Sequence, residues 1–205
     1  MIFLDGNTRE FGRSNSFKMK HSILTSLAFA TIIGSVSWGQ GVDLKSSSIQ
    51  WQGGNVTGKM HFGEVHLKEG KLIVAQNEIQ EGRFVVDLTR MTNTDLPEAY
   101  GDKLIGHLQS PDFFDVQSHP NAVLEILSAT PFKNGESYVN ARVTIKGITQ
   151  PVQFKAEKAG KNIRATLVLN RAKFDVRYGS GSFFDNLGDD LILDEITLEV
   201  ELKTT

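Results

Sequence analysis

The stretch 196–202 reads ITLEVEL, in which an apolar residue stands at every second position and a threonine or glutamate lies between. A period of two is typical of a β-strand with one buried face, because successive side chains of a strand point to opposite sides. The same alternation recurs after residue 42, in the segments 56–62, 72–74, 82–88, 122–126, 139–145, 152–156 and 165–169. The repetition predicts an all-β protein of seven or eight strands.

Short turns separate these segments. Asn134–Gly135 lies between two alternating runs and is the clearest hairpin signal, because both residues accept a positive φ. We expect further turns at Glu69–Gly70 and Ala159–Gly160. Strands at this spacing, joined by short turns, favour an antiparallel sandwich or a closed barrel. Since no linker or change of composition interrupts them, residues 42–205 are expected to form one domain.

One segment departs from the strand pattern. At 102–110 the sequence DKLIGHLQS places Leu104, Ile105 and Leu108 on one face of a helix, and Pro111 stops that helix. The sequence DFFD follows at 112–115. We therefore expect one short helix over about 102–110.

The composition is that of an ordinary globular protein, with 40% hydrophobic residues, 22% charged residues and a net charge of −2. Nucleic-acid binding needs a basic surface, so no nucleic-acid partner is expected. The chain has no cysteine, which excludes disulfides and thiolate chemistry. Phe, with 13 residues, outnumbers Trp and Tyr together, which suits an apolar core or an apolar cavity.

The N-terminal region has the pattern of an export signal. Lys18, Lys20 and His21 precede the apolar run ILTSLAFATIIGSV at 23–36, which has the length of a signal-peptide core and is short for a membrane span. Serines at 35 and 37 supply the small residues of a cleavage site. We predict a signal peptide over 19–37 and a mis-annotated extension over 1–18. The signal peptide predicts a periplasmic or secreted protein with no membrane span after cleavage.

The sequence holds no arrangement typical of catalysis or metal binding. It has neither a GxSxG nucleophile motif nor an HExxH zinc motif. His61 and His66 are an odd number of positions apart, so a regular strand places them on opposite faces. We therefore expect no enzyme activity, no catalytic residue, no cofactor and no metal.

Several motifs, in the same order along the chain, resemble the YceI-like family of exported bacterial proteins. The most specific are KLxxHLxSxDFFD at 103–115 and VTIKGIT at 143–149. The others are SIQW at 48–51, HFGEV at 61–65, GRFVVDL at 82–88, HPNA at 119–122 and NRAKF at 170–174. The resemblance spans about residues 42–202, and it departs from the family at Val143, where leucine is usual, and at Ala141, where glycine is frequent.

The resemblance implies an eight-stranded antiparallel, lipocalin-like barrel with the helix near its mouth. It also implies an interior tunnel for a long-chain lipid, which would be a polyisoprenoid, quinone-like or fatty-acyl chain. Strand parity and the family motifs together place these side chains along the tunnel: Trp51, Phe62, Val86, Leu104, Leu108, Phe113, Phe114, Val143, Ile145, Phe154 and Phe174. The candidates for holding a head group are His61, His107 and Arg171, although Arg171 also has Asp87 or Asp175 as possible ion-pair partners.

Periodicity alone does not show that the barrel is hollow, because eight strands enclose either side chains or one small ligand. The sequence is therefore compatible with two functions. One is an exported carrier that holds a lipid for transport, storage or stress protection. The other is a ligand-free structural, stress or adhesion protein of the same fold. A homodimer is compatible with both.

Overall fold

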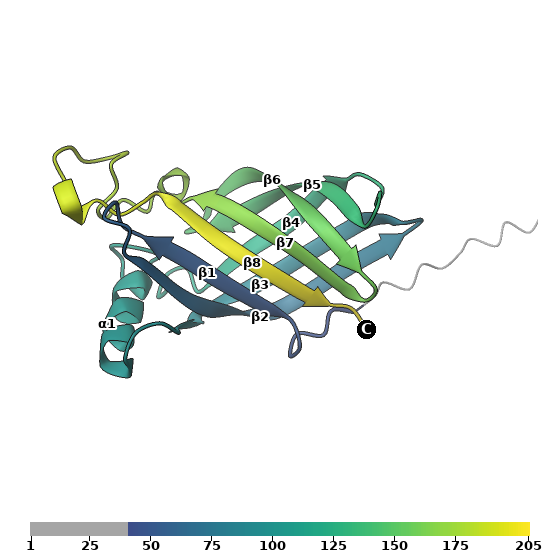
Figure 1. Ribbon diagram of the computed structural model, residues 1–205, viewed down its shortest axis with the longest axis horizontal. Helices are drawn as coiled ribbons and strands as arrows, with labels where there is room; N and C mark the ends of the chain where they lie inside the picture. The colour runs from purple at the N-terminus through teal and green to yellow at the C-terminus, as the bar shows by residue number, and fades with distance from the viewer. Residues whose placement is uncertain (1–40) are drawn as a thin grey trace, which may run out of the picture. The chain divides into compact units, whose positions relative to one another are not determined.

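A computed structural model describes residues 41–205, so the expected extension over 1–18 and signal peptide over 19–37 lie outside the described residues. Eight antiparallel strands pair in sequence order, and the pairing of β1 with β8 closes them into a barrel (Figure 1). The prediction of an all-β, eight-stranded antiparallel barrel is confirmed. The strands are β1 (Ser48–Gly54), β2 (Met60–Ala75), β3 (Glu78–Asn93), β4 (Asn121–Ala129), β5 (Glu136–Ile145), β6 (Ile148–Ala159), β7 (Asn162–Asn170) and β8 (Glu195–Lys203).

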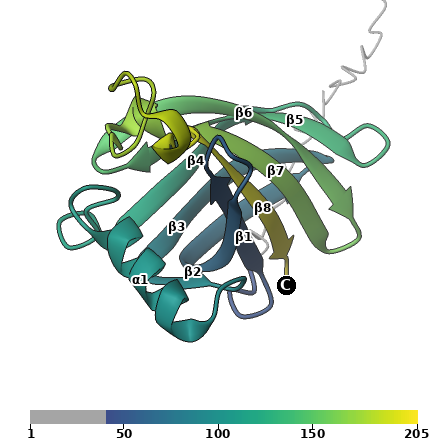
Figure 2. The same cartoon turned by 60° about the vertical axis from the view of Figure 1, so that its left-hand side comes forward.

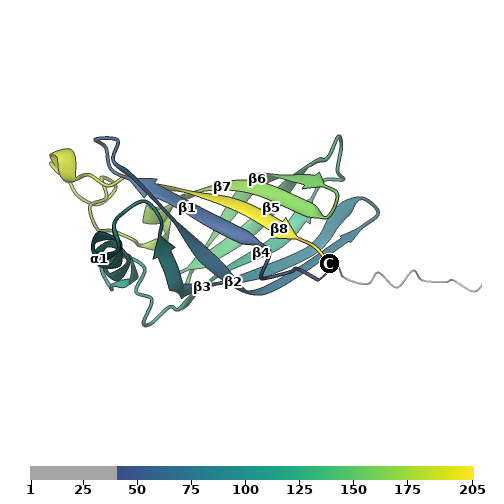
Figure 3. The same ribbon diagram turned by 60° about the horizontal axis from the view of Figure 1, so that its bottom comes forward.

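The two ends of the barrel differ in their connections. The helix end carries the connections 55–59, 94–120, 146–147 and 171–194, and with them the helix α1 (Glu98–Gln109) and the short helices η1 (Arg171–Phe174) and η2 (Gly188–Asp190). Figures 1, 2 and 3 all show α1 and the β7–β8 connection at this end, away from the C-terminus. The opposite end carries the connections 76–77, 130–135 and 160–161, none of them longer than six residues. There the Thr205 N–H donates to the Gly41 carbonyl at 2.9 Å.

Two of the three expected turns are confirmed. Asn134 and Gly135 have φ values of 53° and 85° between β4 and β5, as a tight hairpin with two positive φ values requires. Gly160, with φ of 62°, begins the turn that follows β6.

The expected turn at Glu69–Gly70 is wrong, because β2 continues through it to Ala75 and the chain reverses at 76–77. The pairing of β2 with β3 shifts between Leu67 and Glu69, as at a β-bulge. A Cβ at Gly70 would lie 3.1 Å from Val42, so this glycine lets the N-terminal segment approach the strand. The glycine thus reflects a close contact rather than a turn.

Helix α1 is present but begins earlier than the expected 102–110, at Glu98. Pro97 precedes the first turn, where its fixed φ suits a helix start, and Glu98 places a negative charge there. Gly101 does not interrupt the helix; it is buried, and a Cβ there would lie 3.2 Å from Asn93. After Gln109 the Ser110 hydroxyl donates to the His107 carbonyl at 2.7 Å, which closes the last turn.

The expectation that Phe62 faces the interior is wrong: its side chain points outward and is 44% exposed. The inward positions of this part of β2 are the odd-numbered ones, among them His61, Gly63 and Val65. Gly63 fixes this parity, because a Cβ there would overlap the Trp51 indole and the Thr92 carbonyl oxygen. A larger residue cannot occupy that inward position, so Phe62 lies on the other face.

We predict that Gly63→Ala lowers the free energy of unfolding by about 2 kcal/mol, because the added methyl must displace backbone or the buried indole. Gly106→Ala is the matched control. It lies in α1 with nothing within 4 Å of the added atom, and helix propensity should make it stabilising by up to about 1 kcal/mol. Chemical denaturation of both variants measures the difference, and equal effects would contradict the assigned role of Gly63.

Candidate functional site

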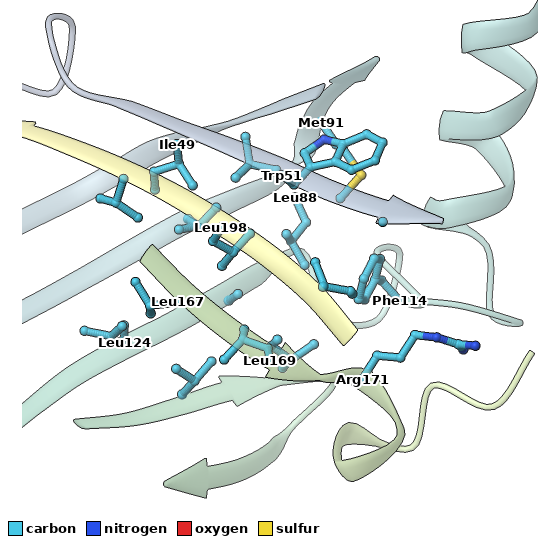
Figure 4. Close-up of a pocket in the computed structure, with 18 of the residues that line it drawn as sticks. Ile49, Trp51, Leu88, Met91, Phe114, Leu124, Leu167, Leu169, Arg171 and Leu198 are labelled. Carbon is cyan, nitrogen blue, oxygen red and sulfur yellow. The ribbon is translucent and has the colours of Figure 1, made fainter. Parts of the chain in front are cut away.

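A cavity of about 410 Å³ occupies the interior of the barrel. Side chains from all eight strands line it, and Figure 4 shows them converging from β1, β3, β7 and β8. On β7, Leu167 and Leu169 face inward and are buried, while Val168 between them is 53% exposed. The inward-facing residues of the period-two pattern thus form the wall of the cavity.

The cavity is closed at one end and reaches the surface at the other. Near the end opposite α1 its wall consists of buried aliphatic side chains, namely Leu72, Ile79, Ala156, Ile163 and Leu202. The exposed lining residues are Lys59 and Leu193, both at the helix end. The Leu193 N–H donates to the Gly54 carbonyl at 2.9 Å, which joins the β7–β8 connection to β1 at this mouth.

Polar side chains in the cavity wall are confined to the same end. They are Asn55, Lys59, His61, His107 and Arg171. The Trp51 indole N–H is already used, since it donates to the Thr92 carbonyl at 3.1 Å. The wall is therefore apolar along the strands and polar at the mouth, which suits an amphiphile whose polar end stays near the surface.

The structure places all but one of the expected lining side chains in the cavity wall. Those present are Trp51, Val86, Leu104, Leu108, Phe113, Phe114, Val143, Ile145, Phe154 and Phe174. The exception is Phe62, which lies outside. The head-group candidates His61, His107 and Arg171 also line the cavity.

Much of the cavity wall consists of residues that were not among the expected lining residues. Leu124, Leu167 and Leu198 line the cavity, and their places in alternating runs were a sufficient signal. Asn55 and Lys59 were also missed. They lie in an irregular connection, where no periodicity indicates which side chains turn inward.

Arg171 is a buried cation at the mouth. Its guanidinium donates to the carbonyls of Val176, Ile192 and Leu193 at 3.0, 3.0 and 3.1 Å. Its charge is balanced by Asp194, 3.4 Å away, and neither Asp87 nor Asp175 is the partner. Burial lowers the pKa of Arg171, yet a guanidinium remains charged at neutral pH. The residue thus ties the start of the β7–β8 connection to its end, close to where β7 and β8 meet.

The two lining histidines differ in their partners. His61 Nδ1 lies 2.8 Å from Asp95 Oδ2, and the other oxygen of the same carboxylate, Oδ1, accepts the Phe62 N–H at 2.8 Å. His107 Nε2 is buried and has no hydrogen-bond partner among residues 41–205. The His107 ring packs edge-on against Phe113 and Tyr178, with centroids 5.7 and 4.4 Å apart. The His107 ring therefore lines the cavity, while its Nε2 is covered by neighbouring atoms and is left unpaired.

Within the described part of the chain, no group of three or more histidine or acidic side chains is arranged to hold a metal ion. Over the same residues, no helix has the length and apolar character needed to cross a membrane.

The closed barrel, with an apolar interior that reaches the surface at the helix end, defines the class: this is a lipocalin-like β-barrel protein. The chain belongs to the YceI-like domain family, whose sequence profile matches residues 41–204. A UPF0312 protein of Shewanella denitrificans is 25% identical over 148 residues, covering 70% of this chain and 75% of the relative.

Solved structures share the fold. BcnA of Burkholderia cenocepacia matches with a TM-score of 0.59 at 19% identity, over 80% of this chain and 99% of that protein. A polyisoprenoid-binding domain from Saccharophagus degradans matches with a TM-score of 0.56 at 13% identity, over 82% of this chain and 99% of that domain.

We predict that Arg171→Lys lowers the free energy of unfolding by about 3 kcal/mol. The guanidinium reaches the three carbonyls through Nε, Nη1 and Nη2, whereas the donors of an ammonium share one nitrogen and cannot occupy all three positions, which leaves buried acceptors unpaired. Arg177→Lys is the control, since that side chain is exposed and pairs only with Asp175 on the surface. Denaturant unfolding of both variants checks this. Equal stabilities would show that the buried guanidinium does not hold the connection.

Asp95 should make stability fall in acid. Burial alone would raise the pKa of its carboxyl, but hydrogen bonds from Phe62, His61 and Asn93 outweigh burial and hold that pKa below its usual 3.8. The stabilisation is therefore complete above the unfolded-state pKa and is lost as the pH falls through the lower folded-state pKa.

The expected result is that Asp95→Asn loses less stability than the wild type between neutral pH and acid. The measurement is the free energy of unfolding across that range. Asp112→Asn, at an exposed site with no side-chain hydrogen bond among the described residues, should follow the wild-type curve. A wild-type curve parallel to that of Asp95→Asn would contradict the prediction.

Proposed function

We propose that this protein binds a long-chain apolar ligand, a polyisoprenoid or a similar lipid, inside the barrel. The observation that carries the proposal is the distribution of polarity along the cavity. Along the strands, starting from the end opposite α1, its walls are aliphatic and aromatic, and its polar side chains lie at the mouth. A ligand with a long apolar chain and one small polar end matches this distribution.

The energetics of such binding are adequate without strong polar contacts. Burying a methylene yields about 0.8 kcal/mol, so ten of them contribute roughly 8 kcal/mol. Association costs on the order of 4–15 kcal/mol in lost freedom. Ten buried methylenes therefore offset a cost in the lower part of that range, and about twenty, at roughly 16 kcal/mol, offset all of it. The cavity volume of about 410 Å³ lies in the usual range for ligand sites. The polyisoprenoid-binding domain from Saccharophagus degradans, which has the same fold, supports this ligand class.

The proposal is for binding rather than catalysis. Two of the polar groups at the mouth are engaged in holding the structure: Arg171 bonds three carbonyls, and His61 is held by Asp95. We also propose that the protein is exported, on the strength of the apolar run at 23–36 and its small-residue end. The mature chain would then carry its ligand in the periplasm or outside the cell.

We predict that Leu167→Trp abolishes ligand retention, because the larger side chain fills the cavity, while Val168→Trp on the outer face of the same strand retains it. The measurement is organic extraction of each purified protein followed by mass spectrometry, with melting temperatures to confirm folding. Wild type and Val168→Trp should yield a long-chain lipid in stoichiometric amount. Consistently empty wild-type protein that also fails to take up an apolar fluorophore would refute the proposed function.

A further inference from the structure

Exposed apolar side chains gather beside the mouth of the cavity. We call this set the aromatic rim; it consists of Val56, Tyr178, Phe183, Phe184 and Leu193, each between 37% and 53% exposed. They come from the β1–β2 and β7–β8 connections, which lie together at the helix end (Figure 2). Apolar side chains grouped in this way on a surface mark a contact with another apolar phase or molecule.

Ordered backbone presents the rim. The Phe183 and Phe184 N–H groups both donate to the carbonyl of Ser180, a residue with no exposed surface. The Ile192 N–H donates to the Gly179 carbonyl at 2.8 Å, and the Val56 N–H donates to Leu191 at 2.9 Å. The two connections are therefore joined to each other, and the phenylalanines project from a hydrogen-bonded base.

The rim is continuous with the cavity. Leu193 belongs to both, since it is exposed and also lines the cavity. Tyr178 packs edge-on against His107 with centroids 4.4 Å apart, and His107 lines the cavity. An apolar surface thus leads from the rim to the interior. A partner that delivers or receives an apolar molecule through this mouth must itself offer an apolar phase, which favours a lipid bilayer.

The charges around the rim indicate which kind of bilayer the rim would contact. Asp185, Asp189 and Asp190 are exposed and form no ion pair among the described residues. The cation Arg177 lies over the Phe183 ring at 5.0 Å and already pairs with Asp175 at 2.6 Å. Lys59, in the connection that carries Val56, is also exposed and forms no ion pair among the described residues. The three aspartates outnumber it, so the net unpaired charge is negative and an anionic membrane surface would be repelled.

We propose that the aromatic rim inserts into the surface of an uncharged, zwitterionic lipid bilayer and so directs the mouth of the cavity toward the membrane. This inference goes beyond ligand binding, and vesicle binding does not require an occupied cavity. Aromatic side chains are suited to the boundary between head groups and acyl chains.

The test is co-sedimentation of the purified protein with phosphatidylcholine vesicles. The double variant Phe183→Ser/Phe184→Ser should lower the partition coefficient at least about tenfold, given the apolar area that it removes. The matched control is Leu127→Ser/Tyr138→Ser, at side chains 60% and 65% exposed near the opposite end, and it should bind like the wild type. Melting temperatures show that both double variants are folded.

Two further measurements make the outcome decisive. Binding to phosphatidylcholine should persist when the ionic strength is raised to about 1 M, and replacing part of the lipid by anionic phosphatidylglycerol should weaken it at low salt. Leu167→Trp, whose cavity is filled, should bind vesicles like the wild type, which separates this proposal from the one on ligand binding.

Three results would overturn the proposal. They are no binding of the wild type to phosphatidylcholine vesicles, an equal loss in both double variants, and binding that appears only with anionic lipid. Light scattering that shows a wild-type dimer converted to a monomer by Phe183→Ser/Phe184→Ser, without any vesicle binding, would instead assign the rim to self-association.

Discussion

The pairing of β1 with β8 is the constraint on which the rest of the molecule depends. Ile49 pairs with Val200 and Trp51 with Leu198, and these contacts turn an open sheet into a closed wall. Once the wall is closed, every second side chain of each strand must share one interior. The cavity, its apolar character and the outward place of Val168 all follow from that closure.

The mouth is organised by a different kind of interaction. A buried guanidinium is costly unless its hydrogen bonds and charge are satisfied, and Arg171 meets that requirement with three carbonyls and Asp194. Arg171 and all four partners belong to the β7–β8 connection, so the residue that needs these partners also joins the start of the connection to its end. The long, irregular segment therefore has a defined conformation at the position where the cavity reaches the surface.

Much of the fold and of the site could be predicted because strands carry a period that is visible in sequence. Leu167 and Leu169 show it, and both line the cavity. The errors arose where a local feature changes the period. The close contacts of Gly63 place the odd-numbered residues of this part of β2 inside the barrel, so Phe62 points outward. At Glu69–Gly70, β2 has a bulge instead of the expected turn and continues to Ala75. The ion pair between Arg171 and Asp194 joins the first and last residues of the irregular β7–β8 connection, and no pattern in the sequence indicates such a pairing.

The hydrogen bond between Thr205 and Gly41 has a consequence for how this domain can be attached to other things. It places both ends of the described chain at the pole of the barrel farthest from the mouth. A reporter, an affinity tag or an immobilising surface joined after Thr205 would leave the opening unobstructed. A circular permutant, with Gly41 and Thr205 joined and new ends made between Asn134 and Gly135, would also have its ends at the pole opposite the mouth, because that hairpin lies there.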